Sequence, residues 1–293
     1  MRFSLRQLQV FTEVARGESV SRAAEALAMS QSAVSGSLLE LERQFDVRLF
    51  ERVGKRLRLS ELGRSLRPGA EALCQQALEL EQGFAGRADA GELRVGATLS
   101  IGNYLCAPLM ARFGREHPGS SVTLRVANTA EIARSVKNFE IDVGLVEGEL
   151  TDPELEVTRW RRDELVVFCS PKHPFAKRRK LTDADLVKAQ WIVREHGSGT
   201  RQAFEQAMHG VLAELQVVLE LGHTEAIKSA VKAGLGVGCV SRIALVDAFR
   251  HKSLVPCAVP ARDFRRWFYF LVHRQKFQSR ALATWLALCR GAE

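Results

Sequence analysis

Side chains that can hydrogen-bond to base edges gather at the predicted start of one helix. The sequence predicts a helix from Gln31 to about Phe45, with Ser30 well placed to cap it. When such a helix lies in the DNA major groove, its first residues face the bases, where Gln pairs with adenine, Ser serves several bases and Ala contacts the thymine methyl. The candidate base-reading residues are Gln31, Ser32, Ala33 and Ser35. The alternative is that the serines are only solvated.

A second group of polar residues follows predicted strands in the rest of the chain. Ligands of open α/β sheets bind beyond the carboxyl ends of strands, where helix N-termini present N–H groups. Taken alone, each hydroxyl is best explained as a helix cap, but their convergence on one cleft favours a site for a small anion. The candidates are Thr98, Ser100, Asn103, Glu147, Ser198, Gly199, Thr200, Arg201 and Thr224.

Two charged residues of this group admit two interpretations. Arg201 either adds positive charge to the cleft or faces solvent or pairs with Glu205 on its own helix. The Glu147 carboxylate opposes an anion unless it is protonated or paired. Otherwise it favours a ligand that carries a proton or an amine.

The elements that position the first group are small helices and a wing. Apolar residues at helical spacing begin at Leu5, and a helix over 22–28 follows, capped by Ser19 or Ser21. The helix from Gln31 has four residues that we expect to face inward: Val34, Leu38, Leu41 and Phe45.

Two short strands over 47–52 and 57–60 then surround a glycine-containing turn with basic residues at its tip. Arg52, Lys55 and Arg56 suit phosphates or the minor groove, although most charge runs are simply solvated.

Ser60 caps a long predicted helix to about Arg87, in which Pro68 introduces a kink. Because its apolar stripe has no domain of its own, we expect pairing with another copy of the chain. The alternative is packing on its own winged domain. Hinge-like composition follows near residues 88–91.

From residue 93 onward, strands alternate with helices. The pattern predicts strands at 93–97, 122–126, 141–146, 165–169, 191–193, 217–221 and 236–240, with helices between them. This succession is typical of α/β units with parallel strands.

Composition narrows the function classes. Residues 1–90 hold 13 Lys and Arg against 12 Asp and Glu, and residues 91–293 hold 29 against 22, so the basic charge near the wing is local.

The six scattered cysteines form no C-x-x-C pair, which argues against zinc and favours buried free thiols over a redox pair. No enzyme motif is present, and no cofactor is expected. Without a signal peptide or a membrane-length apolar run, a solute-binding protein is disfavoured and a cytoplasmic location is expected.

The chain resembles the LysR-type transcriptional regulators over essentially its whole length. The matching segments lie at 8–11, 21–27, 30–35, 49–52, 59–63 and 226–238. Gly36 departs from the family, where arginine is frequent. The segments 194–201 and 222–225 look most like the branch that contains CysL and YeiE, which is tied to sulfur metabolism.

This resemblance implies a regulator that binds double-stranded DNA as a homodimer or homotetramer and contacts RNA polymerase if it activates. It implies a winged helix-turn-helix over 1–60, a linker and dimerisation helix over 61–88, and a periplasmic-binding-protein-like effector domain over 91–293. Subdomain I comprises 91–161 and 266–293, and subdomain II comprises 162–265. The effector implied by the branch is a small oxyanion such as sulfite, and a thiol-based redox sensor is the alternative.

Overall fold

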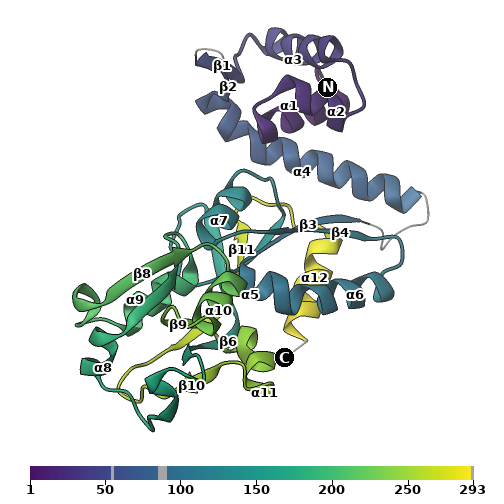
Figure 1. The fold of residues 1–293 in the computed structure, drawn as a ribbon. Helices are drawn as coiled ribbons and strands as arrows, with labels where there is room; N and C mark the ends of the chain where they lie inside the picture. The colour runs from purple at the N-terminus through teal and green to yellow at the C-terminus, as the bar shows by residue number, and fades with distance from the viewer. Residues whose placement is uncertain (54–55, 85–90, 292–293) are drawn as a thin grey trace.

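The computed structural model describes residues 1–53, 56–84 and 91–291. A small helical unit with a two-stranded wing lies at the top of Figure 1. One long helix, α4, lies between this unit and a larger α/β half. The larger half contains the whole of the second sheet, which has both parallel and antiparallel strand pairs. Among the described residues, no helix has the length and apolar character needed to cross a membrane.

Three helices form the N-terminal unit because each has a serine cap and one apolar face. They are α1 (Leu5–Gly17), α2 (Val20–Ala26) and α3 (Gln31–Phe45), capped by Ser4, Ser19 and Ser30. Ser19, rather than Ser21, therefore caps α2, which begins two residues earlier than predicted. The predicted inward residues Val34, Leu38 and Leu41 of α3 are buried.

Phe45 is a correction to the predicted core. It ends α3 with its side chain 42% exposed and lies beside Phe3, with ring centroids 6.3 Å apart. The chain turns there through Asp46 in the left-handed region at φ 52°, which ends the helix before Phe45 can reach the interior. The wing follows as the antiparallel strands β1 (Phe50–Val53) and β2 (Arg56–Leu59).

Helix α4 (Glu61–Phe84) contains Pro68 and directly follows Ser60, whose hydroxyl accepts a hydrogen bond from the Gly63 N–H at 2.9 Å. Its residues Ala70 and Cys74 pack on the core of the N-terminal unit. The helix also leaves large apolar side chains exposed, namely Leu62, Leu66, Leu73, Leu78, Leu80 and Phe84. Leu62, Leu66 and Leu73 lie beside Ala70 along one groove with the N-terminal unit, so this apolar stripe is only partly covered by that unit.

The first lobe of the larger half is built on three parallel strands: β3 (Glu92–Ala97), β4 (Ser121–Val126) and β5 (Val143–Glu147). Its helical segments are α5 (Leu99–Ile101), the π-helical turn η1 (Gly102–Cys106), α6 (Ala107–Glu116), α7 (Thr129–Lys137) and the C-terminal α12 (Arg280–Arg290). Trp285 of α12 is fully buried against Phe113 of α6, with ring centroids 5.5 Å apart.

The second lobe is built on β7 (Gln190–Arg194), with β8 (Gln216–Leu221) and β9 (Val237–Ser241) parallel to it on its two sides. The short strand β10 (Val255–Cys257) pairs with β6 and lies outside the main order of strands in the sheet. Its helical segments are η2 (Pro174–Lys177), α8 (Asp183–Lys188), α9 (Gly199–Ala207), η3 (Leu212–Glu214), α10 (Thr224–Lys232), η4 (Arg242–Leu245) and α11 (Val246–Arg250).

Two long strands join the lobes, and they correct the expectation of a parallel sheet. β6 (Leu155–Cys169) and β11 (Arg265–His273) pair antiparallel with each other, β11 pairs antiparallel with β5, and β6 pairs antiparallel with β9 and β10. Only residues 165–169 of β6 were predicted as a strand. The first part of β6 carries charged residues that interrupt the apolar pattern used to find strands.

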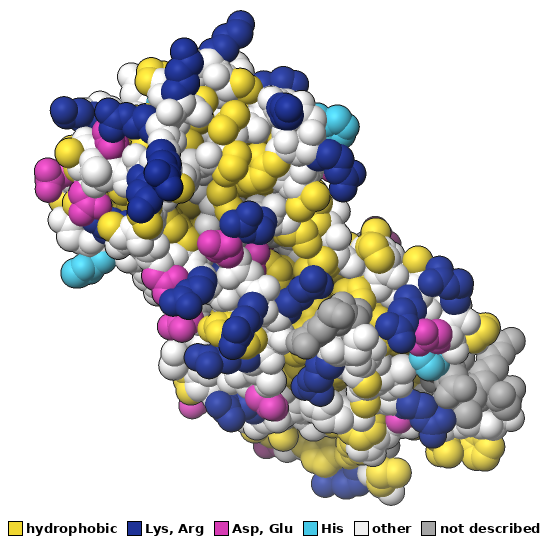
Figure 2. Space-filling model, turned by 90° about the horizontal axis from the view of Figure 1, so that it is seen from below, with side chains coloured by type: hydrophobic (Ala, Val, Ile, Leu, Met, Phe, Trp, Pro, Cys, Tyr) yellow, Lys and Arg dark blue, Asp and Glu magenta, His cyan; other side chains and the backbone are white. Residues whose placement is uncertain are grey.

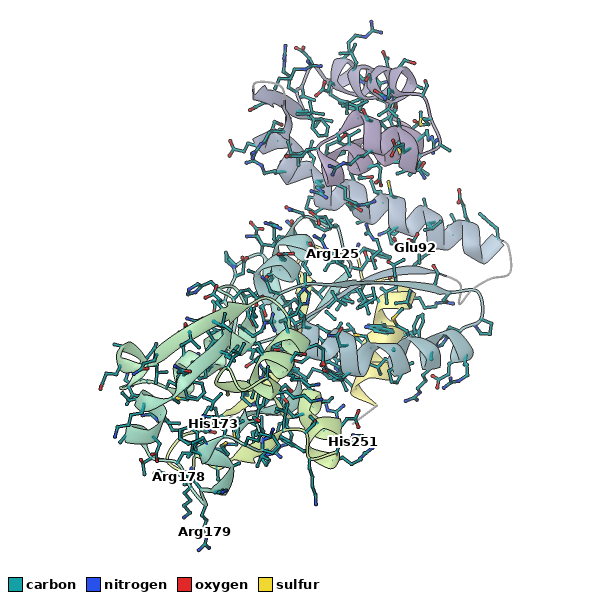
Figure 3. All side chains as sticks on the ribbon, viewed as in Figure 1. Glu92, Arg125, His173, Arg178, Arg179 and His251 are labelled. Atoms are coloured by element: carbon teal, nitrogen blue, oxygen red, sulfur yellow. The ribbon has the colours of Figure 1, made fainter. Side chains whose placement is uncertain are left out.

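The positive charge of the larger half is not concentrated near the wing. Arg178 and Arg179 project from the end of the second lobe remote from the helical unit (Figure 3). Lys and Arg side chains are spread over the whole face seen from below in Figure 2. These charges do not extend the DNA-facing surface predicted around α3 and the wing.

Candidate functional site

The candidate cleft is organised around one buried carboxylate. Glu147 is the last residue of β5, a strand with every residue buried, and its own exposure is 1%. Its Oε1 accepts hydrogen bonds from the Thr98 hydroxyl and the Ser100 N–H, both at 3.0 Å. Its Oε2 accepts one from the Thr200 hydroxyl of the second lobe. Four predicted site residues are therefore in direct contact.

Arg266 of β11 neutralises this carboxylate. Its Nη2 lies 3.0 Å from Glu147 Oε2, its Nη1 donates to the Thr200 hydroxyl at 3.1 Å, and its Nε donates to Asp163 Oδ2 at 2.7 Å. Burial alone would raise the pKa of Glu147, but the charge of Arg266 and the hydrogen bonds from Thr200 and Ser100 outweigh burial and lower that pKa to about 2. Glu147 is thus a paired carboxylate.

Sequence reasoning missed Arg266, Asp163 and Ser241, whose hydroxyl donates to Asp163 Oδ1 at 2.7 Å. The available signal was a charge at the start of an apolar run, since Arg266 precedes the buried segment from Phe268 to Val272. A buried carboxylate needs a cation nearby, but the sequence does not identify which of its many arginines supplies it.

The lobes also meet through backbone at the start of α9. The Gly199 N–H donates to the Thr129 hydroxyl at 3.2 Å, and that hydroxyl donates to the Glu147 carbonyl at 2.9 Å. A Cβ on residue 199 would lie 1.9 Å from the same carbonyl oxygen, so glycine is required there. Ser198 acts as the cap of α9, accepting from the Thr200 N–H at 3.2 Å. Thr129 is a further residue that sequence reasoning missed.

Three buried polar atoms of the cleft residues have no hydrogen-bond partner within the part of the chain that the structure describes. They are Ser100 Oγ, Thr224 Oγ1 and Arg266 Nη2; the last of these is ion-paired with Glu147 without hydrogen-bond geometry. The Tyr104 hydroxyl donates to Glu225, which brings the first turn of α10 against the turn that follows Ser100. All three atoms can donate to an acceptor.

Two predicted ligand residues lie in other surroundings. The Arg201 guanidinium donates to Glu205 at 2.5 Å, to Glu220 at 3.2 Å and to the Arg194 carbonyl at 3.0 Å, all within the second lobe. This arrangement matches the alternative of pairing on its own helix. Asn103 is exposed in η1.

The candidate base-reading residues lie on one open surface. Gln31, Ser32, Ala33 and Ser35 are exposed in the first turns of α3. The Ser30 hydroxyl caps this helix by accepting from the Ala33 N–H at 3.1 Å, and it lies 2.9 Å from the Ser32 hydroxyl. A Cβ at Gly36 would meet nothing within 4 Å, so the position is open.

Arg52 is exposed on β1 of the wing. Arg56 belongs to β2, and Lys55 lies outside the described residues.

All six cysteines are free thiols, and five are buried. Among the described residues, no cluster of three or more His, Cys, Asp or Glu is arranged to hold a metal ion.

The ion pair yields a stability prediction. Arg266→Met leaves Glu147 and Asp163 buried without their cation, and should lower the unfolding free energy by about 3–5 kcal/mol in urea denaturation. Arg265→Met is the matched control on the same strand, because Arg265 is 80% exposed and pairs with an exposed Asp263. Equal losses for the two variants would contradict a special role of Arg266.

Comparison with known proteins agrees with both halves of the fold. Residues 5–64 match the family "Bacterial regulatory helix-turn-helix protein, lysR family", and residues 86–293 match the LysR substrate binding domain. The chain is 42% identical over 292 residues to the uncharacterized HTH-type transcriptional regulator YeiE of Escherichia coli K12, covering 100% of this chain and 99% of that protein. It is 35% identical to the RuBisCO operon transcriptional regulator of Allochromatium vinosum, covering 94% and 92%.

Among solved structures, a full-length OxyR variant from Pseudomonas aeruginosa superposes with a TM-score of 0.76 at 20% identity, covering 98% of this chain and 95% of that one. The CcmR regulatory domain of Synechocystis, in complex with 2-PG, matches with a TM-score of 0.64 at 28% identity, covering 69% and 96%. With a helix-turn-helix, a linker helix and a two-lobed substrate binding domain in one chain, the protein belongs to the LysR family of transcriptional regulators, within the group resembling YeiE.

Proposed function

We propose that this regulator binds a small oxyanion between its two lobes and that the bound anion modulates how it holds DNA. The observation that carries the proposal is a pair of buried hydroxyls with no hydrogen-bond partner among the described residues, Ser100 Oγ and Thr224 Oγ1, together with the buried cation Arg266, whose Nη2 is ion-paired with Glu147. Leaving a buried polar atom unpaired costs about 1–3 kcal/mol, so a ligand that accepts these hydrogen bonds recovers that free energy.

The charges of the site favour the same ligand class. Glu147 and Asp163 are both ion-paired with Arg266, so neither carboxylate presents an uncompensated negative charge to a ligand. Thr224 is the first residue of α10, a helix end where backbone N–H groups and the helix dipole attract negative charge. Sulfite is the oxyanion suggested by the resemblance to the sulfur-linked branch. Thr98, Ser198, Gly199 and Thr200 would then have a supporting role, because their hydrogen bonds are made to other residues of the protein.

Isothermal titration of the full chain with sulfite, sulfate, phosphate and O-acetylserine tests this site. We expect one oxyanion to bind, and Ser100→Ala and Thr224→Val each to weaken it roughly 10- to 100-fold through loss of a hydrogen bond to a charged group. Ser229→Ala, an exposed serine on the same helix as Thr224, should leave the affinity unchanged. No heat of binding with any oxyanion would refute the proposal.

For the DNA half, we propose that α3 reads bases with Gln31, Ser32, Ala33 and Ser35 while the wing binds phosphate through Arg52, Lys55 and Arg56. The open, exposed start of α3 supports the first part, and the exposure of Arg52 supports the second. We assign residues 1–60 to this domain, 61–88 to the linker and 91–293 to the effector domain. If the protein activates transcription, RNA polymerase is a further partner.

Arg52→Ala should weaken binding to specific and nonspecific fragments alike and should reduce the slope of log affinity against log salt by about 1. The specific fragments are first selected from genomic DNA by the protein itself. Affinity is then measured by filter binding over a range of salt concentrations. Arg179→Ala removes another exposed charge, at the remote end of the second lobe, and should change neither quantity (Figure 3). An unchanged slope for Arg52→Ala would count against a phosphate contact.

We further propose that α4 pairs with the α4 of a second copy, giving a homodimer that can assemble into a homotetramer. Leu66, Leu73 and Leu80 recur every seven residues, and all three are exposed. Together with Phe3 and Phe45, the first two line an apolar groove of about 550 Å³. Such a surface is typical of an interface.

Leu80→Asp should shift the protein toward monomers in sedimentation velocity, because it places a charge in the proposed interface. Leu235→Asp makes the same change at a leucine of the second lobe that is 51% exposed, against 60% for Leu80. If both variants sediment like the unaltered protein, pairing through this stripe is wrong.

A further inference from the structure

Tyr104 of the first lobe is anchored in the second lobe. It belongs to the π-helical turn η1, and its hydroxyl donates a hydrogen bond to the Glu225 carboxylate of α10. Its ring packs against an apolar cluster of the second lobe that contains Phe168 and Ile227. The segment that begins with α5 accordingly lies beside α10 in Figure 1. Both the ring and the hydroxyl of one side chain therefore hold the lobes together.

The sequence explains the unusual turn that carries Tyr104. In an unbroken α-helix, the N–H of residue 108 would donate to the Tyr104 carbonyl. Residue 108 is Pro108, which has no N–H and whose ring would clash with that carbonyl. The wider π-helical turn accommodates the missing donor, and such turns are frequent at functional sites. Gly102 lets this turn lie against β4, since a Cβ there would be 2.7 Å from a methyl group of Val126.

The acceptor of this hydrogen bond is held by a neighbouring cation. Lys228 Nζ donates to Glu225 Oε1 at 2.8 Å and lies 5.8 Å from the centre of the Tyr104 ring. Burial and the Glu225 carboxylate raise the pKa of Tyr104, so its hydroxyl keeps its proton and donates at neutral pH. The Glu225 side chain is 61% exposed, which places the contact at the rim of the cleft.

The interlobe contact of Tyr104 lies next to both hydroxyls of the proposed anion site. Ser100 precedes Tyr104 by four residues, and Thr224 directly precedes Glu225. The hydroxyls of Ser100 and Thr224 are the buried pair that has no hydrogen-bond partner among the described residues. One ion can accept from both only while each O–H···O distance is about 2.5–3.0 Å, so it requires the two lobes to stay close.

We propose that Tyr104 is a positioning residue whose hydrogen bond to Glu225 keeps the two lobes closed over the anion site. The consequence for the ligand rests on the proposed oxyanion function, but the contact itself forms without a ligand. Opening this side of the cleft requires the ring to leave its apolar cluster and the hydroxyl to lose its acceptor. Tyr104 thus controls affinity without donating a hydrogen bond to the anion.

Hydrogen exchange of the full chain without ligand, measured by mass spectrometry, tests the contact. Tyr104→Phe removes only the hydroxyl, so we expect the amides of residues 99–106 and 224–228 to exchange about 5-fold faster, the factor that corresponds to one hydrogen bond. Glu225→Ala should have the same effect. The double variant should add nothing further, because both residues act through one bond.

Tyr269→Phe is the matched control. It makes the same chemical change at a tyrosine of the first lobe whose charged neighbours, Glu149 and Arg159, belong to the same lobe. It should leave the exchange of both segments unchanged.

Isothermal titration with sulfite then measures the consequence for the ligand. Tyr104→Phe should weaken sulfite binding about 5-fold, and Tyr269→Phe should not change it. Glu225→Ala is left out of the titration because it also removes a negative charge near the anion site.

Three outcomes separate the two proposals. Unchanged exchange in Tyr104→Phe would overturn the contact. Faster exchange with unaltered sulfite affinity would overturn its role in closing the lobes over the anion. Faster exchange in a protein whose unaltered form binds no oxyanion supports the contact and refutes the proposed ligand instead.

Discussion

The ion pair between Glu147 and Arg266 is the interaction on which the larger half depends. It joins the last residue of β5 to a strand that crosses between the lobes, with both side chains buried. A buried charge is tolerated only when it is paired and hydrogen-bonded. Thr98 satisfies the carboxylate from the first lobe and Thr200 from the second. The need to keep these two buried charges satisfied therefore holds the two lobes together at the end of β5.

Helix α7 connects the contacts around Glu147 to the linker helix α4. α7 begins at Thr129, which contacts both Gly199 and the Glu147 carbonyl, and ends next to Asn138. The Asn138 carbonyl accepts a hydrogen bond from Arg67 of the linker helix, whose guanidinium also lies 5.4 Å from the centre of the Phe139 ring. Glu71, one turn further along α4, accepts from Arg16 of α1 at 3.3 Å. Thus a short series of direct contacts runs from the interlobe surface to α1 of the winged unit.

The predictable parts of the molecule are those with local signals. Serine caps and helical spacing locate α1 to α4 within a few residues, and Glu147 was recognised because it ends a predicted strand at the edge where ligands of α/β sheets bind. Phe45 was wrongly placed inside, since spacing alone does not show where a helix turns away from its core. β11 and the first part of β6 were missed because their pairing is decided by strands far away in the sequence. For the same reason Arg266, the cation that completes the site, could not be chosen from 42 Lys and Arg residues.

This missing cation changes how the site is interpreted. From the sequence, Glu147 opposed an anion unless it was protonated or paired, and a ligand with an amine was the open alternative. An amine would need a carboxylate whose charge is not already compensated by a cation. Both oxygens of Glu147 are engaged, as are both of Asp163. Within the part of the chain that the structure describes, the cleft atoms left without partners are the hydroxyls of Ser100 and Thr224, and each can donate a hydrogen bond. A negatively charged ligand with several hydrogen-bond acceptors complements these hydroxyls, whereas a cationic ligand would be repelled by the positive charge of Arg266. The pairing of Glu147 is therefore what makes an acidic residue compatible with an anion site.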